Sequence, residues 1–375
     1  MQKPGRVVLH VGLTKTGTTW LQGLLAGQRE RLVEHGVRYP YVRPGAQFEG
    51  AVEVRGSETR FGLDPDRVRG TWAAVCGRAR EAAAMGETVL LSHEVLAGAT
   101  PGQVRWALEP LAGLDVRVLV TARDLGRQAV AHWQERVKLG DPRSFAAFAD
   151  EELRADTGPD PRGLGPDDGG VRPRFWHGQD LADTLARWTG PLGAGTGGLV
   201  VCPAPGAPRA ELWRRFATAA GVPTSALDPT AEVPGNASLG AGEVALLREV
   251  NARLADRLDA RTYHAVVKRG FAENDLAARR GAAGWSAVMT PADLGPLLGG
   301  ATLGWIEAVR AAGHPVHGEV TDLDPVLAEP GAPGPDATVP PDLDVDAIVA
   351  DLLRRAETHR APPRRPTLLD RLRRR

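Results

Sequence analysis

The sequence contains few lysines and few cysteines. Of its 375 residues, four are lysines, against 42 arginines, and only Cys76 and Cys202 are cysteines. Two cysteines cannot build a disulfide framework or a zinc site, and they indicate a reducing compartment, so we expect a cytoplasmic protein. Basic and acidic residues balance at 46 each, so no overall field would attract nucleic acid, and we expect no nucleic-acid partner.

Long apolar runs are also missing. No stretch approaches the roughly 20 apolar residues that a membrane span requires. The few residues before position 6 lack the apolar core of a signal peptide, which agrees with a cytoplasmic location. A chain of this length can bury a large core, either as one large domain or as two small ones.

Apolar segments alternate with helical patterns along most of the chain. The patterns predict buried strands at 6–13, 88–92, 115–121 and 199–202, and helices at 18–35, 67–85, 101–112, 178–189, 209–221 and 240–260. This alternation predicts an α/β fold with a central parallel sheet in three layers, similar to P-loop proteins, and with helical insertions. Segments 39–62 and 155–174 are rich in turn residues, and we expect both to be irregular and to shape a substrate pocket.

A segment rich in proline and glycine at 326–341 sets off the C-terminal part of the chain. We therefore expect one α/β domain over 1–325, this linker, and then an amphipathic helix at 345–353 within a C-terminal region of 342–375. Residues 354–375 include nine arginines and two acidic residues. Such a tail is typical of a solvated segment, with a weak contact to an anionic membrane as the alternative.

The most informative segment is the first predicted strand with the turn that follows it. An apolar run at 7–13 precedes Thr14-Lys15-Thr16-Gly17-Thr18-Thr19, and a helix follows. A strand, a small hydroxyl-rich turn and a helix form the layout of a phosphate-binding loop. Compared with the nucleotide loop G-x-x-x-x-G-K-[ST], both glycines are present, as Gly12 and Gly17, but Thr18 occupies the lysine position. This departure argues against chemistry on ATP and Mg²⁺.

The lysine of this loop stands inside the turn instead, as Lys15. A chain that uses arginine ten times as often as lysine and keeps a lysine here indicates a need for an ammonium group. A lysine is a mobile point charge, suited to following charge that develops on a reacting oxygen.

Residues 14–21 resemble the 5′-phosphosulfate loop of the sulfotransferases that use 3′-phosphoadenylyl sulfate (PAPS), P-K-T-G-T-T-x-L, with Thr14 in place of proline. The resemblance is to the bacterial, actinobacterial-like members of that family. It implies PAPS as co-substrate, no metal, and a catalytic Lys15 at the oxygen that bridges phosphorus and sulfur. It also implies that the loop residues bind the 5′-phosphate: Thr14, Lys15, Thr16, Gly17, Thr18 and Thr19.

A second segment, 121–127, resembles the 3′-phosphate motif of the same family, R-D-P-x-x-R with a serine eight residues after the first arginine. The resemblance implies that Arg123 binds the 3′-phosphate in bidentate fashion. Leu125 replaces the proline, and Ala131 stands at the serine position. We expect Arg127 to supply the missing contact, with Lys268-Arg269 as the alternative. Independently of the family, an arginine and an aspartate at a helix start also suit a local ion pair.

Transfer of a sulfuryl group to an acceptor requires a residue that takes the acceptor's proton. Ser92-His93-Glu94 follows the strand at 88–92, and family members use a histidine or a glutamate in this role. We rank His93 and Glu94 equally, with Glu49 third. His10, within the first strand, is expected to be a buried structural residue.

These observations favour a sulfotransferase that acts on a hydroxyl or amine of a small-molecule, glycan or lipid acceptor. Two alternatives remain open. One is a P-loop kinase or NTPase with an atypical loop, for which Asp124 would be the metal ligand. The other is a non-catalytic module that binds 3′-phosphoadenosine 5′-phosphate (PAP).

Overall fold

The computed structural model of the chain describes residues 5–154, 175–233, 238–276, 278, 287–332, 334–339 and 343–359. The chain forms two compact units, which are described separately. The first comprises Met1–Trp133, Ser144–Asn236 and Val288–Asp336, and the second comprises Gln134–Arg143, Ala237–Ala287 and Ala337–Arg375. The predicted excursion at 155–174 and the end of the basic tail, 360–375, lie outside the described residues. The predicted domain boundary at 325 remains a prediction.

The first unit is built on a six-stranded parallel sheet of order β2-β3-β1-β4-β5-β6. Its strands are β1 (Arg6–His10), β2 (Val37–Arg38), β3 (Thr88–Ser92), β4 (Asp115–Ala122), β5 (Gly197–Val201) and β6 (Val316–His317). The prediction of an α/β fold with a central parallel sheet is therefore confirmed. The four predicted strands are all present, whereas β2 and β6 were not predicted, because two residues carry no period.

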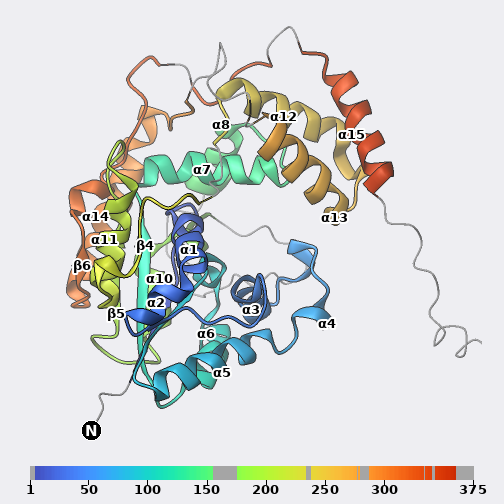
Figure 1. Cartoon of the computed structure of the whole chain (residues 1–375). Coiled ribbons are helices and arrows are strands. Elements are labelled where there is room, and N and C mark those ends of the chain that lie inside the picture. The colour runs from blue at the N-terminus through green and yellow to red at the C-terminus, as the bar shows by residue number, and fades with distance from the viewer. Residues whose placement is uncertain are drawn as a thin grey trace, which may run out of the picture. The chain divides into compact units, whose positions relative to one another are not determined.

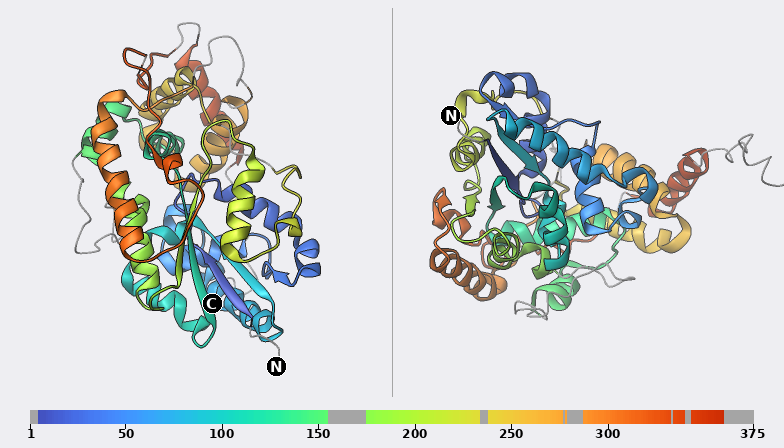
Figure 2. Two further views of the ribbon diagram at one scale, coloured as in Figure 1. Left: turned by 90° about the vertical axis from the view of Figure 1, so that its left-hand side faces the viewer. Right: turned by 90° about the horizontal axis from the view of Figure 1, so that it is seen from below.

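Helices cover both faces of this sheet, so the unit has three layers (Figures 1 and 2). On one face, α1 (Thr18–Gly27), α2 (Arg29–Glu34) and α11 (Arg209–Ala220) share a core with Val8, Leu90, Leu119 and Val200. On the other face, α5 (Thr71–Ala84) packs against β1 and β3, and α10 (Leu181–Thr189) packs against β4 and β5. Apolar residues on both faces of the inner strands explain their continuous apolar sequence.

The remaining helices of this unit are α3 (Ala46–Arg55), α4 (Pro65–Val68), α6 (Pro101–Leu108), α7 (Leu125–Lys138, whose last residues count with the second unit), α8 (Phe145–Phe148), α9 (Phe175–Gln179) and α14 (Gly295–Ala311). The prediction that 39–62 is irregular is wrong, because α3 lies within it. Gly45 and Gly56 flank α3 in the left-handed conformation, at φ 78° and φ 58°, and cap the helix rather than interrupt it.

The helix predicted at 18–35 is divided at Gln28, where α1 ends and α2 begins. The Gln28 side chain donates to the Asp228 carbonyl at 2.9 Å and accepts from the Asp228 amide at 2.8 Å. This distant partner was not apparent from the local sequence pattern, which continues across the break.

The second unit is helical, with α12 (Ala241–Leu254), α13 (Ala260–Tyr263), a π-helix at His264–Leu276 and α15 (Val345–His359). The helix predicted at 345–353 is thus present and continues to His359. Lys268 forms an ion pair with Glu135 within this unit.

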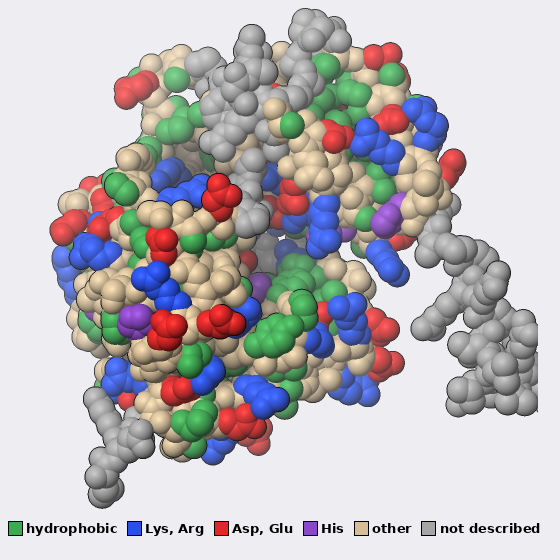
Figure 3. Space-filling view, in the orientation of Figure 1, with side chains coloured by type: hydrophobic (Ala, Val, Ile, Leu, Met, Phe, Trp, Pro, Cys, Tyr) green, Lys and Arg blue, Asp and Glu red, His purple; other side chains and the backbone are tan. Residues whose placement is uncertain are grey.

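Across the described ranges, no helix is long and apolar enough to cross a membrane. On the face shown in Figure 3, basic side chains lie interspersed with acidic ones, in keeping with their equal numbers.

Candidate functional site

The carboxyl ends of β1 and β4 form a topological switch point in the sheet. From β1 the chain turns toward β2 at one edge, and from β4 it continues to β5 and β6 on the opposite side. Ligands of open α/β sheets bind in the crevice at such a point. The segments that follow β1, β4 and β3 are the Lys15 loop, Arg123-Asp124 and His93-Glu94. The three predicted segments therefore end neighbouring strands, as expected.

The loop after β1 first runs beside β4 and then turns sharply. The amides of Val11 and Leu13 donate to carbonyls of β4, at 2.8 and 3.1 Å. Lys15 then takes a left-handed backbone with φ 67°, and Gly17 follows with φ 80° as the N-cap of α1. A non-glycine residue in this region is strained by about 1–2 kcal/mol. No side chain caps the start of α1, so its first N–H groups point toward the loop without a side-chain acceptor.

Two glutamine side chains hold the residue before Lys15. Gln128 of α7 donates to the Thr14 carbonyl and to Gln179 of α9, and Gln179 donates to the Thr14 hydroxyl. Gln128 and Gln179 are each 1% exposed. The hydroxyl of Thr14 thus has a defined partner in this chain.

The residue after Lys15 is held by a different set of groups. The Thr16 hydroxyl donates to the Leu13 carbonyl at 2.6 Å and lies 2.7 Å from the Thr121 hydroxyl. The Thr16 carbonyl accepts from the Cys202 thiol, whose pKa burial raises to about 12. The phosphate contact predicted for Thr16 would therefore come from its backbone N–H rather than from its hydroxyl.

His10 lies behind the loop and is fully buried in the sheet. Its ring contacts Ser92 of β3 at 2.8 Å and Thr121 of β4 at 3.1 Å. Burial lowers the pKa of His10 to about 4, a result that the charge of Glu94 opposes only in part. The imidazole is therefore neutral at pH 7, and the expected structural role of His10 agrees with its burial.

Gly12 provides the space for these contacts. A Cβ atom at position 12 would lie 2.4 Å from Thr121 Oγ1, 2.5 Å from Thr18 Cγ2 and 2.7 Å from His10 Nε2. The first glycine of the loop is thus required by side chains packed behind it.

His93 and Glu94 begin the short 3₁₀-helix Glu94–Gly98 (η2) after β3. The Val95 amide donates to His93 Nδ1 at 3.2 Å, so a neutral His93 carries its proton on Nε2. Burial lowers the pKa of His93, although the neighbouring Glu94 opposes this. His93 is therefore neutral near pH 7 and presents a donor rather than a free acceptor.

Glu94 has the opposite character. Burial alone would raise its pKa, but His93 and hydrogen bonds from Gln22 and Thr18 outweigh this and hold the pKa of Glu94 below its usual value. Gln22 Nε2 lies 2.8 Å from Glu94 Oε2. Because Gln22 and Thr18 belong to α1, the carboxylate is tied to the helix that follows the loop.

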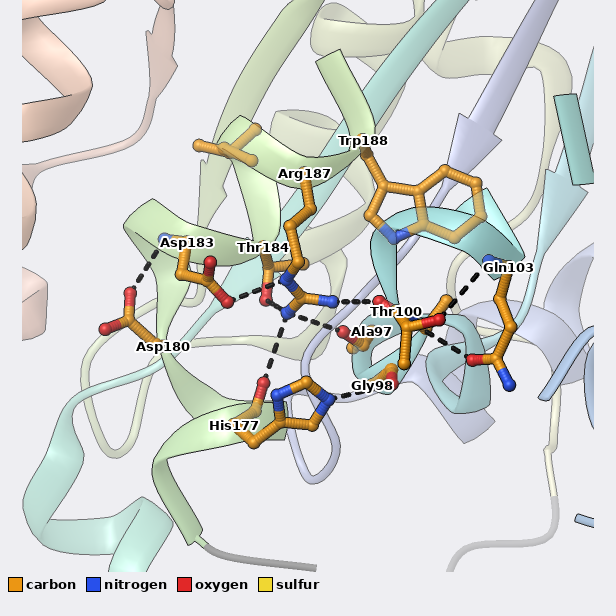
Figure 4. A network of polar contacts seen from close by, with 12 residues as sticks. Ala97, Gly98, Thr100, Gln103, His177, Asp180, Asp183, Thr184, Arg187 and Trp188 are labelled. Carbon is orange, nitrogen blue, oxygen red and sulfur yellow. Dashed lines mark hydrogen bonds and ion pairs between the residues drawn. The ribbon is translucent and has the colours of Figure 1, made fainter. Parts of the chain in front are cut away.

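The turn that carries Glu94 is fixed from α10 by Arg187 (Figure 4). The Arg187 guanidinium donates to the carbonyls of Ala97, Ala99 and His177 and pairs with Asp183. Trp188 adds a bond from its indole N–H to the Leu96 carbonyl, at 3.2 Å. These contacts leave the backbone after Glu94 little freedom to move.

Glu49, the third predicted base, lies on α3 and is 4% exposed. Its carboxylate forms ion pairs with Arg43 and with Arg67. The Glu49 carboxylate is thus engaged by two arginine side chains.

Arg123 follows β4 and is largely enclosed. Its Nη2 donates to the Arg127 carbonyl at 2.8 Å, while its Nε is buried with no hydrogen-bond partner among the described residues. Burial lowers the pKa of Arg123, with the Cys202 and Asp124 groups opposing. A buried guanidinium with an unused donor suits an anion such as a phosphate.

The acidic neighbour of Arg123 is engaged elsewhere. Asp124 is fully buried, pairs with Arg127, and accepts from the amides of Arg127 and Val326 at 2.9 and 3.1 Å. This local ion pair at the start of α7 was expected as one reading of the motif. The ion pair with Asp124 uses Nε of the Arg127 guanidinium, and Nη2 of the same group donates to the Pro203 carbonyl. A phosphate contact by Arg127 remains a prediction.

The sequence reasoning missed Gln22, Gln128 and Gln179. Gln22 lies one turn after Thr18 on the same face of a predicted helix, so its place beside the loop could have been found. No sequence signal identifies Gln179, which is 165 residues from Thr14 along the chain.

Among solved structures, the chain is similar to a sulfotransferase from Alicyclobacillus acidocaldarius, with a TM-score of 0.37 and 15% identity over 71% of this chain and 96% of that chain. No protein-family model matches the chain, and no curated protein matches it. At this level of similarity, conclusions about activity rest on the side chains described above.

Replacing Gly12 by alanine should destabilise the first unit, because the added methyl would displace Thr121 or His10. We expect a loss of about 1–3 kcal/mol in the free energy of unfolding, measured with urea. Gly27→Ala is the matched control, since nothing lies within 4 Å of a Cβ atom there. Because Gly27 is the last residue of α1, that substitution should change the free energy of unfolding by no more than about 0.5 kcal/mol. Equal effects of the two substitutions would contradict the packing described for Gly12.

The buried neutral His10 should make the protein less stable in acid. Between its ordinary pKa of 6.5 and its folded value of about 4, the unfolded chain binds a proton that the folded chain does not. The free energy of unfolding should therefore fall by about 3 kcal/mol from pH 7 to pH 4 on account of this residue. His10→Gln should reduce the measured decrease by that amount, whereas His359→Gln, at an exposed position, should leave it unchanged.

Proposed function

We propose that the chain transfers a sulfuryl group from PAPS to a hydroxyl or amine of a small-molecule, glycan or lipid acceptor. The observation that carries this proposal is the pairing of two cationic residues at one switch point. Lys15 lies in the loop after β1, and Arg123, whose buried Nε has no hydrogen-bond partner among the described residues, follows the adjacent β4. A ligand with phosphates at two separate positions, as in PAPS, suits this pair better than a single polyphosphate chain.

The 5′-phosphate would bind to the N–H groups of the loop and of the start of α1, where the positive end of the helix dipole favours an anion. Thr14, Thr16, Gly17, Thr18 and Thr19 supply these amides in the proposal. The hydroxyl of Thr18 already bonds to Glu94, so the exposed Thr19 is the better hydroxyl donor. Arg123 would hold the 3′-phosphate, and Arg127 supports Arg123 through its carbonyl.

In the proposed reaction the acceptor oxygen attacks sulfur, the bond from sulfur to the 5′-phosphate oxygen breaks, and PAP leaves. Lys15 would neutralise the charge that develops on the leaving oxygen. Glu94 would take the proton of the substrate hydroxyl or amine, because Glu94 is ionised at neutral pH. The unprotonated nitrogen of His93, Nδ1, already accepts a hydrogen bond from the Val95 amide. With its proton on Nε2, His93 would donate to the acceptor.

The alternative of a kinase or NTPase finds less support in the side chains. Its metal ligand would be Asp124, but both carboxylate oxygens of Asp124 bond to Arg127 or to backbone amides. A non-catalytic module that binds PAP shares the nucleotide contacts and differs only in the absence of turnover.

Metal-free PAP should bind more tightly than ATP with Mg²⁺ in isothermal titration calorimetry. Lys15→Ala and Arg123→Ala should each weaken PAP binding by about tenfold or more, because each removes a charge-assisted phosphate contact. Arg78→Ala, which removes an exposed arginine paired with Glu81, is the control and should bind as wild type does. A preference for ATP with Mg²⁺, or indifference to Arg123, would reject the sulfotransferase proposal.

The choice of base is tested by Glu94→Gln in an assay of PAP release from PAPS with phenol, sugar and sterol acceptors. Turnover should fall by about 10²–10⁴-fold while PAP affinity is kept. With wild type, the acid limb of kcat/KM should lie below pH 4.5, because the pKa of Glu94 is held below that ordinary value. Glu49→Gln should be much less affected. An acid limb above pH 4.5 that His93→Gln removes would instead assign the role to His93.

A further inference from the structure

Four buried side chains and one carbonyl form a continuous chain of hydrogen bonds behind the loop. It runs from Ser92 on β3 to His10 on β1 at 2.8 Å, then to Thr121 on β4 at 3.1 Å, and on to Thr16 at 2.7 Å. It ends at the Leu13 carbonyl, 2.6 Å from the Thr16 hydroxyl. Each of these side chains is at most 2% exposed.

The donor and the acceptor in each of these hydrogen bonds follow from the last bond, between Thr16 and the Leu13 carbonyl. A carbonyl oxygen only accepts, so Thr16 gives its single hydroxyl proton to Leu13 and must accept from Thr121. Thr121 has then used its own proton and must accept from His10 Nε2. A neutral imidazole carries one proton, so His10 Nδ1 accepts from the Ser92 hydroxyl.

Few side chains fit the position of His10. The residue must reach strands on both sides of β1, accept on one edge and donate on the other. Phe216 of α11 packs against the ring, with centroids 4.9 Å apart and planes at 63°. The missing side chain of Gly12 leaves room for Nε2 to meet Thr121.

We propose that His10 is a positioning residue, which acts through Thr121 and Thr16 to hold Lys15 in its left-handed conformation. Lys15 stands between two held neighbours: Thr14, bonded by Gln128 and Gln179, and Thr16, bonded by the His10 chain. The assignment of a role in ligand binding rests on the proposed function. The order of donors and acceptors in the hydrogen bonds from Ser92 to Leu13 does not depend on the proposed function.

The first test is the tautomer of His10, observed by ¹⁵N NMR on protein labelled at histidine. The chain requires a neutral ring with its proton on Nε2 at pH 7, and Thr121→Val should shift the Nε2 resonance. A proton on Nδ1, or a charged ring, would overturn the proposal whether or not the protein binds PAP.

The second test compares Thr121→Val, which removes one hydroxyl at constant shape, with Thr121→Ser, which keeps it. Hydrogen exchange in residues 11–21 should rise at least about tenfold in the valine variant and return to wild-type rates in the serine variant. Thr302→Val is the matched control, because Thr302 is a buried threonine of α14 whose hydroxyl bonds to Leu298. It should leave exchange in the loop unchanged.

The same variants separate this inference from the proposed function. If wild type binds PAP, Thr121→Val and His10→Leu should each weaken binding by about tenfold, and the double variant by no more than either alone. Unchanged binding in Thr121→Val, or additive losses, would overturn the positioning role. If wild type binds no PAP, the proposed function fails, and the exchange and NMR results alone decide whether His10 holds the loop.

Discussion

The left-handed backbone at Lys15 is the constraint on which the candidate site depends. A lysine at φ 67° is unfavourable by itself, so neighbouring groups must maintain it. The structure provides them on both sides, through the glutamines at Thr14 and the buried chain at Thr16. The turn places Lys15 after the carboxyl end of β1, at the switch point of the sheet.

Near the carboxyl ends of β1, β3 and β4, some buried titratable side chains are neutral and others are charged. His10 and His93 are neutral because burial lowers their pKa values, and each has a hydrogen-bond geometry that fixes its tautomer. Glu94 and Arg123 keep their charges, the first through donors from α1 and the second at the cost of a buried N–H that has no partner in the described part of the chain. An anionic ligand would relieve that cost at Arg123, whereas Glu94 already has hydrogen-bond donors from α1.

The sequence predicted correctly those features that depend only on residues close together in the chain. The strand, loop and helix around Lys15 and the position of Arg123 at a strand end follow from residues adjacent in the chain. Thr16 was expected to bind a phosphate, and the partner of its hydroxyl, Thr121, lies 105 residues away and could not be inferred from local sequence. The helix α3 was missed because Gly45 and Gly56 act as caps, which depends on a φ angle that the sequence does not reveal.

The central claim is that Lys15 and Arg123 hold two different phosphates of one nucleotide. The most direct test is the ratio of affinities for PAP and adenosine 5′-phosphate, which differ only in the 3′-phosphate, in wild type and in Arg123→Ala. The account predicts a ratio of about 100 or more in wild type and near one in the variant, while Lys15→Ala weakens both ligands and keeps the ratio. A wild-type ratio near one, or one that Arg123→Ala leaves unchanged, would contradict the account.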